Sequence, residues 1–204
     1  MAMTHREALE VLAACRGQHL VLTTHGSVDA WVSLSDTPFD FAYVPASMGQ
    51  GPALGLGLAL AKSRHGVVVV SGDGSLLMNL GCLVTLANHP ADLFLVVIDN
   101  GVYEVTGGQP IPGAGRTDFA GLARAAGIRR VYSCQTAAAW HAIAAEALSG
   151  PGPVAIGLKV EARPGRRAPT AMRPMEEQLA RVRRALEGEG PTVNRASAGV
   201  GGDT

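Results

Sequence analysis

Two short apolar runs in the middle of the chain each end in a polar, glycine-containing cluster. Val67 to Ser71 is followed by Gly72-Asp73-Gly74-Ser75, and Leu93 to Ile98 is followed by Asp99-Asn100-Gly101-Val102-Tyr103. Short runs of this kind, rich in β-branched residues, are typical of buried parallel strands. Apolar residues recur at helical spacing from Leu76 to Ala87. The segment therefore predicts a strand, helix and strand whose right-handed crossover brings the two polar clusters side by side.

This arrangement makes Asp73 and Asn100 neighbours at one edge of the predicted sheet. A carboxylate and an amide oxygen are hard ligands that suit Mg²⁺, which completes its octahedron with phosphate and water. Gly74 and Ser75 lie where free backbone N–H groups open the predicted helix, and such a terminus attracts phosphate. The residues alone thus indicate a site for a divalent cation and a diphosphate.

Two other interpretations of these glycines deserve comparison. An isolated Gly-Asp-Gly is a common tight turn with an exposed aspartate. The segment Gly49-Gln50-Gly51 with Gly55, followed about twenty residues later by Asp73, also resembles a dinucleotide-binding fingerprint. The dinucleotide fingerprint normally follows the first strand of its fold, but here the strand Leu20 to Thr24 comes earlier. Asp73 also cannot bind a ribose and pair with Asn100 at the same time. The isolated turn is disfavoured because Gly-Asp-Gly occurs together with Asn100 and with a strand before each cluster.

The remaining pattern alternates helices and strands, which predicts an α/β fold: a doubly wound parallel sheet with helices on both faces. Further helices are expected over Thr4–Arg16, Gly51–Ser63, Phe119–Ala126 and Thr136–Leu148, and further strands over His19–Thr24, Phe41–Val44, Arg129–Ser133 and Val154–Val160. Residues 1–160 form one expected domain. Residues 161–187 are expected to form a basic linker and a charged helix from Met175 to Glu187, and 188–204 have the composition of a disordered tail.

Composition narrows the class of protein. Of 204 residues, 47% are apolar, which is enough for a sizeable core. Seventeen basic and 17 acidic residues cancel, so nothing indicates a nucleic acid or a membrane surface as partner. Cys15, Cys82 and Cys134 have neither paired nor metal-binding spacing, which indicates reduced thiols. Without an apparent leader or transmembrane run, we expect a soluble protein of the cytoplasm.

The Gly-Asp-Gly at 72–74, the 25 residues at 75–99 and then Asn100 resemble the cofactor signature of thiamine diphosphate enzymes. The stretch Ala46-Ser47-Met48-Gly49 also falls where that family's diphosphate-binding domain has a matching segment, so the resemblance covers roughly Thr4 to Leu158. It implies thiamine diphosphate and Mg²⁺ as cofactors. The implied metal ligands are Asp73, the Asn100 side chain and the Val102 carbonyl.

The resemblance also implies which residues hold the organic cofactor. Gly72, Gly74 and Ser75 would contact the diphosphate. Met48 matches the bulky residue that holds the cofactor in its V shape, although a methionine here also suits plain core packing. Ala46 stands where the family usually has glycine, and its carbonyl would accept a hydrogen bond from the pyrimidine amine.

Within the family, the chain resembles phosphonopyruvate and sulfopyruvate decarboxylases. The resemblance rests on Ala46-Ser47-Met48-Gly49, Leu56-Gly57-Leu58-Ala59-Leu60, Asp99-Asn100-Gly101-Val102-Tyr103 and Thr106-Gly107-Gly108-Gln109. The length favours the sulfopyruvate type, in which this domain is a separate β subunit. The run from Thr106 to Pro110 also resembles indolepyruvate:ferredoxin oxidoreductase, but three scattered cysteines cannot hold its iron–sulfur clusters.

In such enzymes a glutamate on a pyrimidine-binding domain activates the cofactor, and no glutamate of this chain matches that motif. The resemblance therefore implies an oligomer with a pyrimidine-binding α subunit that supplies the glutamate. The implied reaction is decarboxylation of a small 2-oxo acid, sulfopyruvate by preference and phosphonopyruvate as the alternative. A thiamine diphosphate subunit of a synthase or oxidoreductase and a non-catalytic binding module remain open.

The substrate side of the site is predicted from residues near the strand ends: His25, Glu104, Thr106, Gln109 and Arg116. His25 follows the first strand, where ligands collect in such sheets, but a hydrogen-bonded structural histidine fits equally. Glu104 also suits a surface loop, and Arg116 is either an anion ligand or an exposed loop residue. We expect the remaining histidines at the surface or at helix ends, namely His5, His65, His89 and His141.

Overall fold

A parallel β-sheet forms the centre of the computed structural model, which describes residues 2–44, 48–61, 65–163 and 173–187. Within these ranges the sheet has six strands in the order β2-β1-β3-β4-β8-β7, and every neighbouring pair is parallel. The strands are β1 (Leu20–Thr24), β2 (Asp40–Tyr43), β3 (Val67–Gly72), β4 (Leu93–Asp99), β7 (Arg130–Cys134) and β8 (Val154–Lys159). The central strands are buried on both faces, as runs rich in valine, leucine and isoleucine predict.

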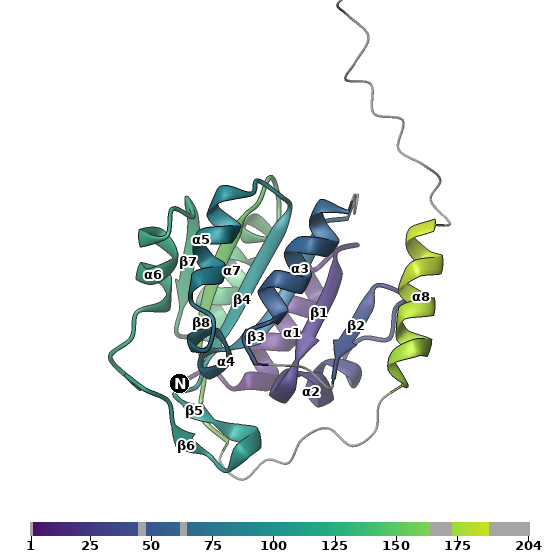
Figure 1. Ribbon diagram of the computed structural model, residues 1–204. Helices are drawn as coiled ribbons and strands as arrows, with labels where there is room; N and C mark the ends of the chain where they lie inside the picture. The colour runs from purple at the N-terminus through teal and green to yellow at the C-terminus, as the bar shows by residue number, and fades with distance from the viewer. Residues whose placement is uncertain (1, 45–47, 62–64, 164–172, 188–204) are drawn as a thin grey trace, which may run out of the picture.

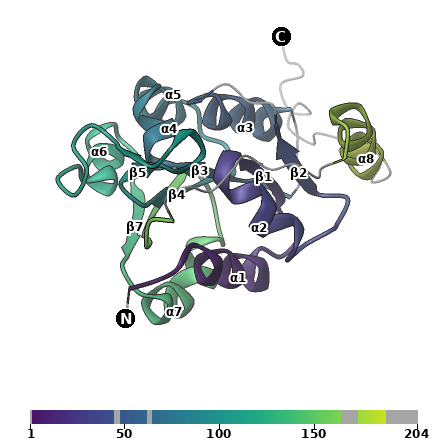
Figure 2. The ribbon, with the colours of Figure 1, turned by 90° about the horizontal axis from the view of Figure 1, so that it is seen from below.

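Helices cover both faces of the sheet, as Figures 1 and 2 show, so the predicted doubly wound fold is confirmed. One face carries α1 (His5–Cys15), α2 (Val28–Val32) and α7 (Ala137–Ala147), which share one apolar core cluster. The other carries α3 (Gly51–Leu60), α4 (Asp73–Leu77), α5 (Gly81–Asn88) and α6 (Phe119–Ala125), around a second cluster. No helix in these described ranges combines the length and hydropathy of a membrane-spanning segment.

The last described helix, α8 (Met175–Glu187), lies beside the edge strand β2 (Figure 1). It begins and ends at the predicted residues. The Gln178 side chain accepts a hydrogen bond of 2.8 Å from the backbone N–H of Ala42 in β2. Since an uncovered edge strand invites pairing with other chains, α8 protects this edge of the sheet.

Register brings the carboxyl ends of three strands together. Val70 of β3 pairs with Thr23 of β1, and Gly72 of β3 pairs with Ile98 of β4. The turns that follow β1, β3 and β4 therefore share one edge of the sheet. The strand order reverses at β1, which has β2 on one side and β3 on the other. Ligands bind at such a switch point in open α/β sheets.

The helix predicted over Leu76–Ala87 is wrong in one respect, because two helices, α4 and α5, occupy this region. The N–H groups of Met78 and Asn79 donate to carbonyls three residues back, which tightens and ends α4. The Asn79 side chain donates 3.3 Å to the carbonyl of Gly49. Apolar residues keep their helical spacing across the break between α4 and α5, so the sequence pattern predicts one continuous helix.

The glycines of α3 do not share one face of the helix. Gly51 and Gly55 face the sheet, where a Cβ on Gly55 would lie 2.2 Å from Cγ2 of Val69. Gly57 points away from them, and a Cβ there would meet nothing within 4 Å. Residues two apart on a helix lie on nearly opposite sides, so the close approach to β3 depends on Gly55.

This difference predicts opposite effects for two glycine substitutions in one helix. Gly55→Ala should lower the free energy of unfolding by about 1–3 kcal/mol, because the added methyl overpacks the contact with Val69. Gly57→Ala should raise it by about 0.5–1 kcal/mol through helix propensity alone. Denaturant unfolding of both variants measures the two effects, and equal changes of the same sign would contradict this packing.

Candidate cofactor and metal site

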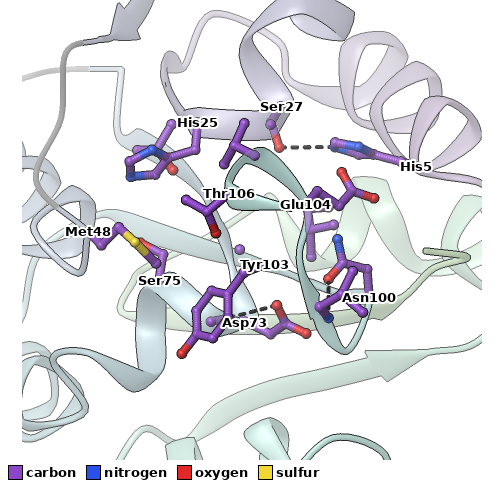
Figure 3. A pocket seen from close by; sticks show the side chains of 17 residues that line it. His5, His25, Ser27, Met48, Asp73, Ser75, Asn100, Tyr103, Glu104 and Thr106 are labelled. Carbon is purple, nitrogen blue, oxygen red and sulfur yellow. Dashed lines mark hydrogen bonds between the residues drawn. The ribbon is translucent and has the colours of Figure 1, made fainter. Parts of the chain in front are cut away.

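A cavity with an empty volume of about 520 Å³ lies at the shared carboxyl edge of β1, β3 and β4. Figure 3 shows its lining. The residues come from the first turn of α1, the 3-10 turn η1 (His25–Ser27) after β1, the start of α4, and the loop after β4. They are His5, Thr24, His25, Gly26, Ser27, Met48, Gly72, Asp73, Gly74, Ser75, Ile98, Asn100, Val102, Tyr103, Glu104, Val105 and Thr106.

Asp73, the first residue of α4, places a buried carboxylate in this cavity, with 1% of its surface exposed. Its two oxygens accept hydrogen bonds of 2.6 Å, one from the N–H of Gly74 and one from the N–H of Gly101. Even so, the pKa of Asp73 is raised to about 6, chiefly by burial and to a lesser extent by the nearby Asp99 carboxylate. A buried carboxylate with this deficit of positive charge suits a cation as its partner.

Asn100 follows β4, and its side-chain oxygen accepts 3.0 Å from the N–H of Val102. Gly101 between them has a φ of 76°, which favours glycine. Because Gly101 also donates to Asp73, this turn and the start of α4 are joined directly. The structure thus brings the three residues of the predicted metal site to one cavity, and their carboxylate, amide and carbonyl oxygens fit Mg²⁺.

The residues predicted for the diphosphate lie beside this turn. Ser75 is buried, and its hydroxyl accepts 2.9 Å from the N–H of Gly49. A Cβ on Gly74 would lie 2.4 Å from Cε1 of Tyr103, so the Tyr103 ring occupies the space that only glycine leaves open. Gly72, where a Cβ would meet nothing within 4 Å, leaves open space beside Asp73 at the start of α4. This glycine-lined space and the polar groups of Asp73 and Ser75 fit a phosphate group.

Met48 lines the cavity near Ser75 (Figure 3), half-buried, and belongs to neither apolar core cluster. This position differs from plain core packing, the alternative considered for this methionine, and the cofactor role of Met48 stays a prediction. Ala46 lies outside the described residues.

His25 also lines the cavity, in a strained conformation. Its φ of 46° is the one positive value among the non-glycine residues described. Burial lowers the pKa of the ring, so the imidazole is neutral at neutral pH. Its Nε2 atom is buried and has no hydrogen-bond partner among the described residues. The ring is therefore not held as a hydrogen-bonded structural histidine through Nε2, and strain of this kind is concentrated at functional sites.

Glu104 begins the 3-10 turn η2 (Glu104–Thr106) and is 5% exposed, so the surface-loop alternative is wrong. One oxygen accepts 2.8 Å from the backbone N–H of Arg163. The other lies 3.7 Å from Nη2 of the Arg163 guanidinium. The carboxylate thus faces the cavity with an arginine behind it.

His5 is a helix-end residue, as expected, because it is the first residue of α1, but it does not lie at the surface. It is 2% exposed and lines the cavity, with Nε2 3.0 Å from Oγ of Ser27. Two contacts hold the start of α1 there: Met3 forms a parallel bridge with Val160, and the N–H of Glu161 donates 2.9 Å to the carbonyl of Met3. A capping box of Thr4 with Glu7 fixes the helix start, but the sequence carries no signal for these tertiary contacts.

Two of the predicted substrate residues do not reach the cavity. Gln109 is exposed on β6 (Gln109–Pro110), which pairs with β5 (Val102–Tyr103) in a small hairpin. Arg116 lines a separate polar cleft near Lys159, whose ammonium lies 3.0 Å from Asp99. Thr106, by contrast, lines the cavity.

Comparison with protein-family models shows which family the chain belongs to. Residues 26–158 match the model described as "Thiamine pyrophosphate enzyme, C-terminal TPP binding domain". The chain belongs to this family. The buried Asp73, the Asn100 turn and the glycine-lined space all fall within the matched residues of the TPP-binding domain.

Individual relatives agree with this family. The chain is 38% identical over 166 residues to phosphonopyruvate decarboxylase of Streptomyces hygroscopicus, covering 80% of this chain and 40% of that protein. It is 42% identical over 111 residues to sulfopyruvate decarboxylase subunit beta of Methanothermobacter thermautotrophicus, covering 53% of this chain and 59% of that subunit. The chain thus spans well under two thirds of either relative.

A solved structure from Mycobacterium smegmatis, described as a thiamin diphosphate-dependent enzyme, shares the fold of the TPP-binding domain. The TM-score is 0.68 at 23% identity, over 78% of this chain and 32% of that chain. His5 and Arg163 lie outside the family match at 26–158, yet His5 lines the cavity and Arg163 contacts two of its residues.

Proposed function

We propose that this TPP-binding domain is the β subunit of a split thiamine diphosphate-dependent 2-oxo acid decarboxylase and that it binds the diphosphate and magnesium. The observation that carries the proposal is the buried Asp73 carboxylate beside the Asn100 turn, in a cavity at the switch point of the sheet. The similarity to a sulfopyruvate decarboxylase subunit beta and to a phosphonopyruvate decarboxylase supports the reaction class.

In this proposal Asp73, the Asn100 side chain and the Val102 carbonyl hold Mg²⁺. Ser75 and the backbone around Gly74 would contact the diphosphate. The remaining cofactor contacts fall to Gly72, Met48 and Ala46. Magnesium keeps few protein ligands and takes the rest of its octahedron from phosphate and water, which suits this donor set.

The chemistry that thiamine diphosphate supplies when bound is an electron sink for the bond broken as carbon dioxide leaves. The chain's own residues orient the ligands and keep the cavity dry. His25 is neutral, its Nε2 has no partner within the described ranges, and it would offer a ring nitrogen to the substrate. Glu104 offers a buried carboxylate whose charge Arg163 opposes. Gln109 has no place in this assignment, because it lies outside the cavity.

The partner in this proposal is a pyrimidine-binding α subunit that supplies the activating glutamate. The carboxylates that line the described cavity are Asp73 and Glu104. Asp73 is assigned to the metal. Glu104 accepts one hydrogen bond from the backbone N–H of Arg163, faces its guanidinium at 3.7 Å and is assigned to the substrate. With both carboxylates assigned elsewhere, the proposal takes the activating glutamate from another subunit.

The substrate we favour is sulfopyruvate, with phosphonopyruvate as the second candidate because of the 38% identity over most of the chain. Both acids carry a second anion. No lysine or arginine lines the described part of the cavity, and Arg116 lies in the other cleft. The second anion would therefore be held by hydroxyl and N–H donors of this chain, Ser27 and Thr106 among them, and by cations of the partner.

Substrate preference tests this assignment. The complex reconstituted with its α subunit should release carbon dioxide from sulfopyruvate or phosphonopyruvate with a specificity constant at least about 100-fold above that for pyruvate, because donors built for an anion stay unpaired with pyruvate. Steady-state assays of carbon dioxide release measure the ratio. A higher specificity constant for pyruvate or an aromatic 2-oxo acid would refute the doubly anionic substrate.

A further inference from the structure

Four side chains from four separate segments form a continuous polar chain along one wall of the cavity. The Glu104 carboxylate accepts from the backbone N–H of Arg163 and faces its guanidinium. The Arg163 guanidinium contacts Nδ1 of His5, and Nε2 of His5 lies 3.0 Å from Oγ of Ser27. Figure 3 shows the His5–Ser27 end of this chain above Glu104.

The chemistry of the groups gives this chain a direction. A guanidinium has N–H donors and no acceptor, so Nδ1 of His5 must be the acceptor in its contact with Arg163. The ring proton of neutral His5 is therefore on Nε2, and Nε2–H donates to the Ser27 hydroxyl oxygen. His5 is 2% and Ser27 4% exposed, so water does not compete for these positions.

Because Ser27 accepts from His5, its own hydroxyl hydrogen remains to be donated. His5 is the hydrogen-bond partner of this hydroxyl within the described residues, and Ser27 lines the cavity. On the same turn η1, Nε2 of His25 is buried and has no partner in the part of the chain that the structure describes. Leaving buried polar groups unsatisfied is costly, so a turn that keeps two of them at one cavity is suited to a polar ligand.

We propose that His5, held by Arg163, is a positioning residue that orients the Ser27 hydroxyl as a hydrogen-bond donor to an oxyanion bound in the cavity. The identity of that oxyanion rests on the proposed function: it is either a phosphate oxygen of the cofactor or an acid group of the 2-oxo acid. The family model matches residues 26–158, so His5 and Arg163, which would orient the Ser27 hydroxyl, lie outside the matched region.

Four variants test the relay. Ser27→Ala removes the donor, His5→Phe keeps the ring volume without polar atoms, and His5→Gln keeps one donor and one acceptor. Ser27→Ala and His5→Phe should each weaken oxyanion binding about ten-fold, because hydrogen bonds to charged groups are strong. The double variant should be no worse than either single one, and His5→Gln should remain within about two-fold of the parent.

The parameter that changes identifies the oxyanion. Calorimetric titration of the full chain with Mg²⁺ and thiamine diphosphate detects a phosphate contact as a raised Kd. Assays of the complex detect a substrate contact as a raised KM with the Kd unchanged. Additive losses in the double variant, or Ser27→Ala with unchanged Kd and KM, would overturn the proposal, as would His5→Gln behaving like His5→Phe.

The tautomer of His5 tests the relay without any ligand. In the full chain at neutral pH, ¹⁵N NMR should show a neutral ring with the proton on Nε2, and Arg163→Ala should allow the Nδ1–H form to appear. A parent ring protonated on Nδ1 or on both nitrogens would overturn the relay. If the parent chain failed to bind thiamine diphosphate, the proposed function would fail, and the tautomer would still decide the relay.

Discussion

Replacing Asp73 by alanine is expected to abolish Mg²⁺-dependent binding of thiamine diphosphate, with a loss of affinity of at least about 100-fold. The carboxylate is buried at the cavity with a pKa raised to about 6, and no cationic side chain is paired with it among the described residues. A magnesium ion held by Asp73 would supply that positive charge and help to hold the diphosphate. Asp73→Asn, which keeps the shape and loses the charge, should lose nearly as much.

Titration calorimetry with thiamine diphosphate, with and without Mg²⁺, measures this effect. Asp118→Ala is the matched control: it removes the capping aspartate of α6, which lines the other cleft, and should leave the affinity unchanged. Thermal unfolding of each variant separates loss of binding from loss of folding. Unchanged affinity in Asp73→Ala would end the assignment of this residue to the metal.

The second large effect concerns assembly. The purified chain with thiamine diphosphate and Mg²⁺ should turn over sulfopyruvate at least about 1,000-fold more slowly than the complex with its α subunit, the size expected when a general acid–base group is missing. Asp73 and Glu104, the carboxylates that line the described cavity, are both engaged by other groups. The proposed function therefore takes the activating group from the partner.

Release of carbon dioxide by the chain alone, by the α subunit alone and by their mixture measures this dependence. A complex whose α subunit carries glutamine in place of its activating glutamate is the control, since it assembles without restoring turnover. Substantial turnover by the chain alone would refute the split arrangement and leave the metal site intact.

The fold was predictable because its signals are local. Buried parallel strands give continuous apolar runs, and the helices between them give apolar spacing, so the sheet from β1 to β8 follows from the sequence. The break between α4 and α5 was not predictable, since the Asn79 side chain that binds the Gly49 carbonyl is set by tertiary contact. The short helix α2 and the hairpin of β5 and β6 contain too few residues for a helical or strand-like spacing of apolar residues to be recognised in the sequence.

At the candidate site, the sequence predicted correctly the position of those residues that directly follow a strand. Asp73 and Asn100 follow neighbouring strands, so topology alone brings them together. His5 was missed because it lies about twenty residues before His25 in sequence and reaches the cavity only through the packing of α1. Gln109 and Arg116 were assigned by nearness along the chain, but the loop after β4 turns both away from the cavity.

The position of β1 inside the sheet determines which residues an independently folding fragment must contain. The family match begins at residue 26, directly after β1, which hydrogen-bonds to β2 on one side and to β3 on the other. A fragment consisting of residues 26–158 alone would lack the interior strand β1. Its neighbours β2 and β3 would then lose the strand that pairs with both of them. The region that sequence comparison recognises is therefore smaller than the unit that folds cooperatively, and an autonomous folding unit must include the preceding helix and strand.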